Sequence, residues 1–236
     1  MPPISFTGLM VILGGLLLLN AGTAAEGQVI TAGPRACPGV ALTYDLCPVR
    51  GAPGLDAELI EFLTSRRIPA TFFMSGKWIA RHEAAVKHLL AVPSFEVGTH
   101  GNVHAHLPLH DPGFQAREIV VPVTMLQSGY GHRAKLFRPP YGEYNNATVE
   151  IVKSLGLQFI LWTIESGDPD PALSADTIVM RVKKRLKPGS IIVFHANGKG
   201  RHTREVTQQL ITTVLPDKGL TPMTMSDLLS CNQPTN

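Results

Sequence analysis

Short apolar runs typical of β-strands alternate with helix-like stretches along nearly the whole chain, and this alternation most constrains its fold. Strands that alternate with helices pair in parallel, because each helix returns the chain to the start of the next strand. The expected strands cover residues 40–44, 70–74, 95–98, 135–137, 158–162, 190–194 and 221–223. The expected helices cover residues 55–67, 77–91, 115–128, 145–155, 175–186, 203–215 and 225–230. The sequence therefore predicts an α/β fold with a mainly parallel sheet.

One domain is expected, because no linker, repeat or low-complexity tract interrupts residues 38–230. The chain has 236 residues, of which 44% are hydrophobic, and α/β barrels of about 200–250 residues are commonly single domains. The alternation fits an open doubly wound sheet and a closed barrel, and both bind ligands at the carboxyl ends of their strands. A nucleotide-binding site is disfavoured, since Leu-Cys-Pro follows the first strand's aspartate instead of a glycine-rich loop.

Five polar segments each follow a run that reads as a strand. They are Thr-Tyr-Asp-Leu-Cys-Pro at 43–48, His-Gly-Asn-Val-His at 100–104, Arg-Pro-Pro-Tyr-Gly at 138–142, Glu-Ser-Gly-Asp at 165–168 and Val-Phe-His at 193–195. Because the ends of parallel strands meet at one edge of a sheet or barrel, these segments are expected to converge. The sequence therefore predicts a single active site built from all five.

Two histidines in the second segment suggest a metal site. On a helical turn, His100 and His104 would share a face, so that both imidazoles could reach one ion, and zinc accepts nitrogen ligands at about 2.0–2.1 Å. The competing interpretation is a polar, histidine-rich loop, since His106 and His110 follow closely. A catalytic zinc needs a third protein ligand and an open position for water or substrate.

Two further segments carry groups suited to acyl chemistry. The prolines before Tyr141 fix the backbone and remove N–H donors, which leaves the Tyr141 N–H as a candidate to stabilise an oxyanion. His195 follows a buried apolar strand, and its unperturbed pKa near 6.5 suits it to protonate a leaving group.

The order and spacing of the five segments resemble the polysaccharide deacetylase family, the NodB-homology domain of the carbohydrate esterases, over residues 38–230. The resemblance implies a distorted (β/α) barrel of about seven parallel strands. It implies that Asp45 takes a proton from the attacking water and that Arg138 holds Asp45 by paired, charge-assisted hydrogen bonds. It also implies that the backbone at Tyr141 contributes to the oxyanion hole. Asp168 stands in the family's fourth motif, and the resemblance implies that its carboxylate orients the His195 ring and stabilises the protonated form of that ring.

The resemblance also implies a divalent metal ion held by His100 and His104, and the chemistry of the site indicates zinc. The family's third metal ligand is a second aspartate directly after Asp45, and this chain has Leu46 there. Asp45 itself, Cys47 or His106 could supply the third ligand, or the site could bind metal weakly or not at all. Cys47 would point to the same side as Asp45 if the strand continued that far.

The implied reaction removes acetyl groups from an N-acetylated polysaccharide or oligosaccharide of the cell envelope, with an O-acetylated glycan as the alternative. Trp78, Tyr141, Tyr144 and Trp162 could stack on sugar rings. With leucine at position 46, a degenerate deacetylase that binds glycan without cutting it remains the second hypothesis. The formal charge of +3 is too small and dispersed to indicate nucleic acid, and no partner protein is predicted.

The first 25 residues are interpreted as a signal peptide, because an apolar run at 9–19 precedes the small residues of 21–25. The expected location is periplasmic or secreted, with an uncleaved membrane anchor as the alternative, since no Lys or Arg precedes the apolar run. In a barrel, the first strand begins and the last helix ends at the same face, which predicts a disulfide between Cys37 and Cys231. Cys47 would then remain a free thiol at the functional face.

Overall fold

The structure is a computed structural model that describes Met1 and residues 29–49 and 54–231. The segment 2–25 of the expected signal peptide lies outside the described residues. Among the described helices, none combines the length and apolar character needed to span a bilayer.

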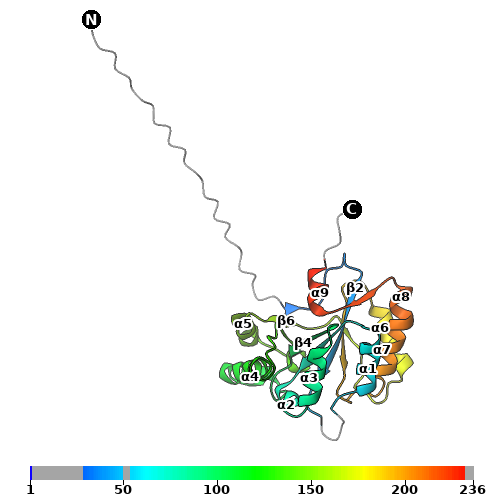
Figure 1. Ribbon diagram of the computed structural model, residues 1–236, viewed down its shortest axis with the longest axis horizontal. Helices are drawn as coiled ribbons and strands as arrows, with labels where there is room; N and C mark the ends of the chain where they lie inside the picture. Colours follow the sequence, from blue (N-terminus) through cyan, green and yellow to red (C-terminus); the bar gives the residue numbers. More distant parts are fainter. Residues whose placement is uncertain (2–28, 50–53, 232–236) are drawn as a thin grey trace.

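A parallel sheet forms the centre of the molecule, as the alternation predicts (Figure 1). In the described part of the chain it contains nine strands, in the order β1-β6-β5-β4-β3-β2-β8-β7 with β9 paired to β2. The strands are β1 Val29–Ile30, β2 Gly39–Leu46, β3 Ala70–Met74, β4 Phe95–Thr99, β5 Leu136–Phe137, β6 Gln158–Ile160, β7 Ile164–Glu165, β8 Ile191–His195 and β9 Thr221–Met223. Every pair along this order is parallel.

The sheet curls into a half-barrel, which confirms the expected (β/α) barrel class within a single domain. Its two outermost strands, β1 and β7, approach each other through Thr163, whose hydroxyl donates a hydrogen bond to the Thr31 carbonyl at 2.7 Å. At the base of the half-barrel, β9 pairs with the first residues of β2. Strand β3 pairs with the last residues of β2.

Helices cover the outside of the sheet (Figure 1). Those nearest the final strands are α1 Ala57–Ser65, α6 Ala175–Arg185, α7 Thr203–Gln209 and α8 Leu215–Asp217, with a π-helical turn at Leu210–Val214 between the last two. Around the other half lie α2 Gly76–Ile79, α3 Glu83–Ala91, α4 Pro112–Tyr130 and α5 Asn146–Ser154. Helix α9, Met225–Ser230, closes the end of the half-barrel where β2 begins.

The side chains of β2 alternate between two apolar clusters, one between the sheet and the outer helices and one inside the half-barrel. Val40, Leu42, Tyr44 and Leu46 all pack into the large apolar cluster beneath the outer helices. Ala41 belongs instead to an inner cluster with Met225 and Leu228 of α9. Because successive side chains of a strand point to opposite faces, odd-numbered positions of β2 face the inside of the half-barrel. Asp45 is the last odd position of the strand.

Cys37 and Cys231 form a disulfide across 194 residues, as predicted. The bond joins the segment before β2 to the end of α9, at the base of the half-barrel. Cys47 is free and buried, two positions beyond Asp45 and near the opposite end of β2.

Candidate active site

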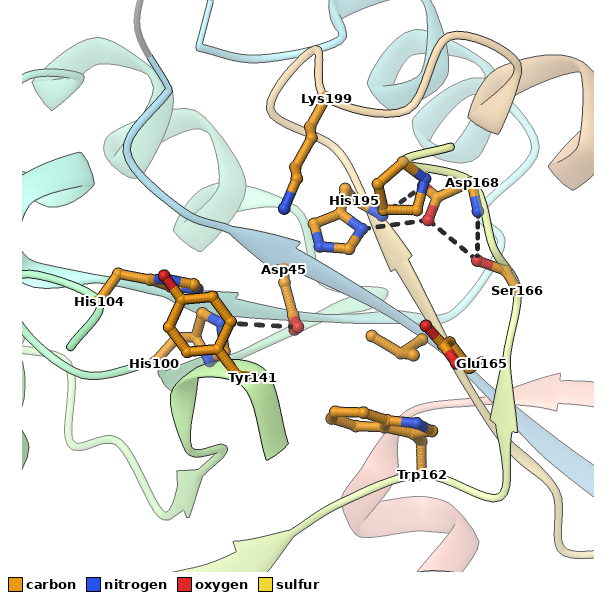
Figure 2. Close-up of a pocket in the computed structure, with 12 residues that line it drawn as sticks. Asp45, His100, His104, Tyr141, Trp162, Glu165, Ser166, Asp168, His195 and Lys199 are labelled. Carbon is orange, nitrogen blue, oxygen red and sulfur yellow. Dashed lines mark hydrogen bonds and ion pairs between the residues drawn. The ribbon is translucent and has the colours of Figure 1, made fainter. Parts of the chain in front are cut away.

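The five polar segments do converge, at the carboxyl ends of the strands (Figure 2). They surround a cavity of about 220 Å³. The predicted residues that line it are Asp45, His100, His104, Tyr141, Asp168 and His195. Arg138 and Cys47, the two remaining predicted residues, are buried, with exposed fractions of 0% and 4%.

An ion pair between Asp45 and Arg138 forms the floor of the site. Arg138 Nη1 donates to Asp45 Oδ1 at 2.9 Å, and Nη2 donates to the Leu161 carbonyl at 3.2 Å. The guanidinium also lies over the ring of Phe73, with Cζ 4.1 Å from the ring centroid. The contact is a single hydrogen bond to the carboxylate, not the paired arrangement that the resemblance implies. Asp45 nevertheless has one oxygen fixed and the other turned toward His100 Nε2, at 3.6 Å.

The electrostatic surroundings keep Asp45 ionised. Burial alone would raise the pKa of its carboxyl group, but the positive charges of His100 and Arg138 outweigh burial and hold that pKa below its usual value. A carboxylate that is ionised and has one free oxygen facing a cavity can accept a proton from water.

His100 and His104 lie in a loop, and the prediction that they share a helical turn is wrong. The backbone bends at Gly101 and at His104, which have φ angles of 67° and 65°. This bend still brings the two rings together, with centroids 5.0 Å apart. His100 Nδ1 lies 2.9 Å from the Arg138 carbonyl. The metal-free site favours a protonated His100 ring beside Asp45. In the neutral ring that a metal ion requires, Nδ1 would keep the proton and donate it to this carbonyl, which leaves Nε2 with a lone pair for the ion.

Cys47 lies beside these two histidines. Its Sγ and one nitrogen of each ring all lie within 4.8 Å of one another, and within the described residues this is the group whose spacing suits a metal ion. Burial alone would raise the pKa of the Cys47 thiol, but His100, His104 and His195 hold it well below its usual range. One thiolate and two imidazoles are a donor set that zinc accepts, so the residues present fit a zinc-type ion.

The other two candidates for a third ligand are placed differently. His106 Nδ1 lies 2.8 Å from Glu143 Oε2, and its ring stacks on Tyr141 with centroids 4.0 Å apart. His106 is thus outside the group formed by Cys47 and the two histidines. Asp45 borders that group through His100 but is engaged by Arg138.

His195 and Asp168 form a second charged pair that lines the cavity (Figure 2). His195 Nδ1 lies 3.1 Å from Asp168 Oδ1, while the His195 backbone N–H donates to Oδ2 at 2.7 Å. Ser166 and Thr203 also donate hydroxyl hydrogen bonds to Asp168, at 2.9 and 2.7 Å. Burial alone would lower the pKa of His195, but Asp168 and the neighbouring Cys47 outweigh burial and raise it to about 10.

Strand pairing explains why Asp45 and His195 lie beside each other. Asp45 on β2 and His195 on β8 are register partners, so their side chains emerge on the same face of the sheet. The cavity therefore carries a carboxylate held ionised and, on the neighbouring strand, an imidazole held protonated. Two titratable groups whose surroundings shift their pKa values in opposite directions are typical of a catalytic acid–base pair.

Aromatic rings border the cavity on one side. Trp162 and the half-exposed Tyr141 line it, whereas Trp78 is fully buried and Tyr144 packs against Phe159. Tyr141 has a left-handed backbone with a φ of 60°, a conformation that costs about 1–3 kcal/mol in a non-glycine residue and is enriched at functional sites. Gly142 has a φ of 71°, and a Cβ there would come within 2.7 Å of the Trp162 ring. The turn thus needs a glycine beside the tyrosine.

Glu118 of α4 supports the site, and the sequence analysis missed it. It is 3% exposed, and its two carboxylate oxygens accept hydrogen bonds from the backbone N–H groups of Asn102 and Val103 at 3.0–3.2 Å. These residues connect His100 to His104. A glutamate in an amphipathic helix is normally solvated, so its sequence context gave no signal of this role.

Glu118→Gln is expected to destabilise the protein by about 1–3 kcal/mol, because an amide cannot offer two acceptor oxygens and a buried N–H loses its partner. Urea unfolding followed by circular dichroism measures the change. Glu150→Gln, at an exposed position of α5, is the matched control and should change stability by less than about 0.5 kcal/mol. Equal stability of the two variants would contradict the bracing role of Glu118.

A family model for polysaccharide deacetylases matches residues 32–160. A peptidoglycan-N-acetylglucosamine deacetylase from Bacillus cereus is 28% identical over 191 residues, which are 80% of this chain and 87% of the relative. An uncharacterized protein from Bacillus subtilis is 25% identical over 173 residues, which are 73% of this chain. The chain covers about half of that relative's length, 52%.

Similar folds occur among solved structures. A pseudoenzyme of carbohydrate esterase family 4 from Bacillus anthracis has a TM-score of 0.77 at 23% identity, covering 86% of this chain and 69% of the other. A mutant of that pseudoenzyme, described as having restored enzymatic activity, has a TM-score of 0.76. At this identity the likeness concerns the fold.

Proposed function

The chain belongs to the polysaccharide deacetylase family, and from this premise we propose that it is a metal-dependent hydrolase that removes acetyl groups from an acetylated glycan. The observation that carries the proposal is the pair of Asp45 and His195, which lie on neighbouring strands and line one cavity. A hydrolase of this kind needs one group that accepts a proton from water and another that donates a proton to the leaving group.

A divalent ion fits beside this pair, with His100 and His104 as ligands from the described cluster. When bound, such an ion lowers the pKa of water and polarises a carbonyl oxygen, which is the chemistry that amide hydrolysis requires. The softness of the nearby sulfur favours zinc over magnesium or calcium.

The protein's own groups then have distinct tasks. Asp45 accepts a proton from the water whose oxygen bonds to the acetyl carbon, and Arg138 keeps its carboxylate oriented. The backbone N–H of Tyr141 donates to the oxyanion that forms at the acetyl oxygen. His195 gives its proton to the sugar nitrogen as the C–N bond breaks, leaving acetate and an amine. Asp168 stabilises the protonated form of His195 through Nδ1.

The proposed substrate is an N-acetylated polysaccharide or oligosaccharide of the cell envelope. The B. cereus relative is named for peptidoglycan N-acetylglucosamine, which supports this substrate class. The faces of Trp162 and Tyr141 along the cavity suit contact with a sugar ring. We place the protein outside the cytoplasm, in the periplasm or secreted, on the strength of the signal-like sequence at its start.

A second candidate function is glycan binding without cleavage. Leu46 stands where the family's first motif carries an aspartate, and a pseudoenzyme shares the fold at a TM-score of 0.77. Against this function stand the complete Asp45–Arg138 and His195–Asp168 pairs, which binding alone does not require.

An acetate-release assay on N-acetylated chitooligosaccharides tests the proposal. Zinc-loaded protein is expected to release acetate, and His195→Ala should lower the rate at least about 100-fold, because general acids contribute about 10²–10⁴-fold. Removing metal with a chelator should abolish release, and adding zinc should restore it. Lys199→Ala, at an exposed position of the cavity rim, is the control for general disturbance of the site.

Zinc-loaded protein that binds these oligosaccharides but releases no acetate would favour the binding function. Release that is unaffected by the chelator would contradict the role of the metal. An O-acetylated xylan assayed in parallel distinguishes amide from ester substrates.

A further inference from the structure

We propose that the Cys47 thiolate is the third protein ligand of the metal site, replacing the aspartate that the family's first motif supplies one residue earlier. This inference rests on the proposed function for the presence of a metal, but it concerns the residues that hold the ion. It makes the site a one-sulfur, two-nitrogen centre.

The alternation of β2 explains the shift by one position. Leu46 is 0% exposed and packs in the outer cluster together with Tyr44, so this position is used for the core. Asp45 faces the inside of the half-barrel, and the next residue of the same parity is Cys47. The extended path continues past the strand, because Ser75 N–H donates to the Leu46 carbonyl and the Asn197 side chain donates to the Cys47 carbonyl at 2.9 Å.

The side chains around Cys47 point to a ligand and not to simple apolar packing. A structural cysteine is normally surrounded by hydrocarbon, whereas the Cys47 sulfur lies within 4.8 Å of a nitrogen of both His100 and His104. His100 is 1% exposed and is oriented by the Arg138 carbonyl. Three donors, one directly after β2 and two from the loop after β4, therefore meet at one point next to the cavity.

The other cysteines leave Cys47 available. Cys37 and Cys231 are bonded to each other at the base of the half-barrel. Cys47 is 4% exposed, and in oxidised protein it is the remaining thiol. Burial limits its reaction with external oxidants, which leaves the sulfur free to bind an ion from the cavity side.

Cobalt substitution tests the ligand directly. A thiolate bound to Co²⁺ gives an intense near-ultraviolet charge-transfer absorption that imidazole and carboxylate ligands do not give. The oxidised wild-type chain titrated with Co²⁺ is expected to develop this band. Cys47→Ser and His100→Ala should abolish it, whereas His106→Ala should retain it. Cys47→Asp should bind Co²⁺ without the band, because it returns an oxygen ligand.

Zinc affinity gives a second readout. Losing an outer-shell partner of a metal ligand costs about 10–100-fold in affinity, so Cys47→Ala is expected to bind zinc at least about 100-fold more weakly in competition with a chromophoric chelator. Thermal unfolding and circular dichroism establish that each variant is folded. If Cys47→Ala does not fold, the wild-type cobalt spectrum still decides the matter.

Cobalt bound in a manner that requires His100, but without a charge-transfer band, would overturn the inference, as would unchanged zinc affinity in folded Cys47→Ala. These results are separable from the proposed function. If cobalt-loaded wild-type protein shows the band but zinc-loaded protein releases no acetate, Cys47 is a ligand and the proposed activity is contradicted. If zinc-loaded protein releases acetate but cobalt-loaded protein shows no band, the activity is supported and Cys47 is not a ligand.

Discussion

Asp45→Asn is expected to lower the rate of acetate release by about 10²–10⁴-fold, the usual contribution of a general base. Asparagine has nearly the same shape and can still accept the hydrogen bond from Arg138 Nη1, but it cannot take a proton from water. The variant should remain folded with reduced stability, because the fully buried Arg138 loses its counter-charge. Steady-state kinetics on zinc-loaded protein, with thermal unfolding in parallel, measures both effects.

Glu165→Gln provides the matched control for Asp45→Asn. Glu165 also lines the cavity with a carboxylate, but it is exposed and its charged neighbour, Arg181 Nη2, is 3.8 Å away. The rate of acetate release by Glu165→Gln is expected to stay within about tenfold of the wild-type rate. Activity of Asp45→Asn within about threefold of the wild type would rule out Asp45 as the base.

The second large effect is on stability. The double variant Cys37→Ser and Cys231→Ser is expected to be less stable by up to about 5 kcal/mol, since in the chain-entropy model a cross-link over nearly the whole domain strongly restricts the unfolded state. For a domain of this size, that corresponds to a fall in Tm of about 10–20 °C. Thermal unfolding with and without reductant measures the change.

The wild-type chain supplies its own control for this prediction. Reductant should lower the Tm of the wild type to that of the double variant and leave the double variant unchanged. A wild-type Tm that is insensitive to complete reduction, verified by thiol titration, would contradict a stabilising role for the bond.

The strands were predicted well where Gly, Pro or polar residues mark both of their ends. The expected strands at 70–74 and 221–223 match β3 and β9 residue for residue. Strands β1 and β7 were missed because two residues are too few to show a period. The expected helix at 77–91 is divided into α2 and α3, because the chain turns at residues 80–82 between them.

The site was predictable because its groups sit at the carboxyl ends of strands. Asp45, Arg138 and His195 each lie within one residue of the last residue of a strand, so the parallel topology alone brings them to one end of the sheet. The segment from His100 to His104 was correctly expected at the end of a strand, but it was predicted to form a helical turn and instead forms a loop. Left-handed angles at Gly101 and His104 are not encoded in a histidine spacing.

Glu118 could not be found from the sequence, because its role depends on tertiary contact. It lies 15 residues from Val103 along the chain, and only the packing of α4 against the loop brings its carboxylate to that backbone. The partners of Asp168 are similarly distant, with Thr203 35 residues away. Such bracing groups carry no local pattern.

The pairing of β2 has a consequence for the order in which the chain folds. Strand β3 follows soon after β2, so that edge can form as soon as residues through Met74 are available. The other edge needs β8, which arrives about 150 residues later. One edge of β2 can therefore pair early and the other only late. Pairing between strands that are distant in sequence slows folding. We expect a growing chain to bring Asp45 and His195 together only after β8 has been synthesised, so that a chain that stops before residue 195 lacks the acid–base pair entirely.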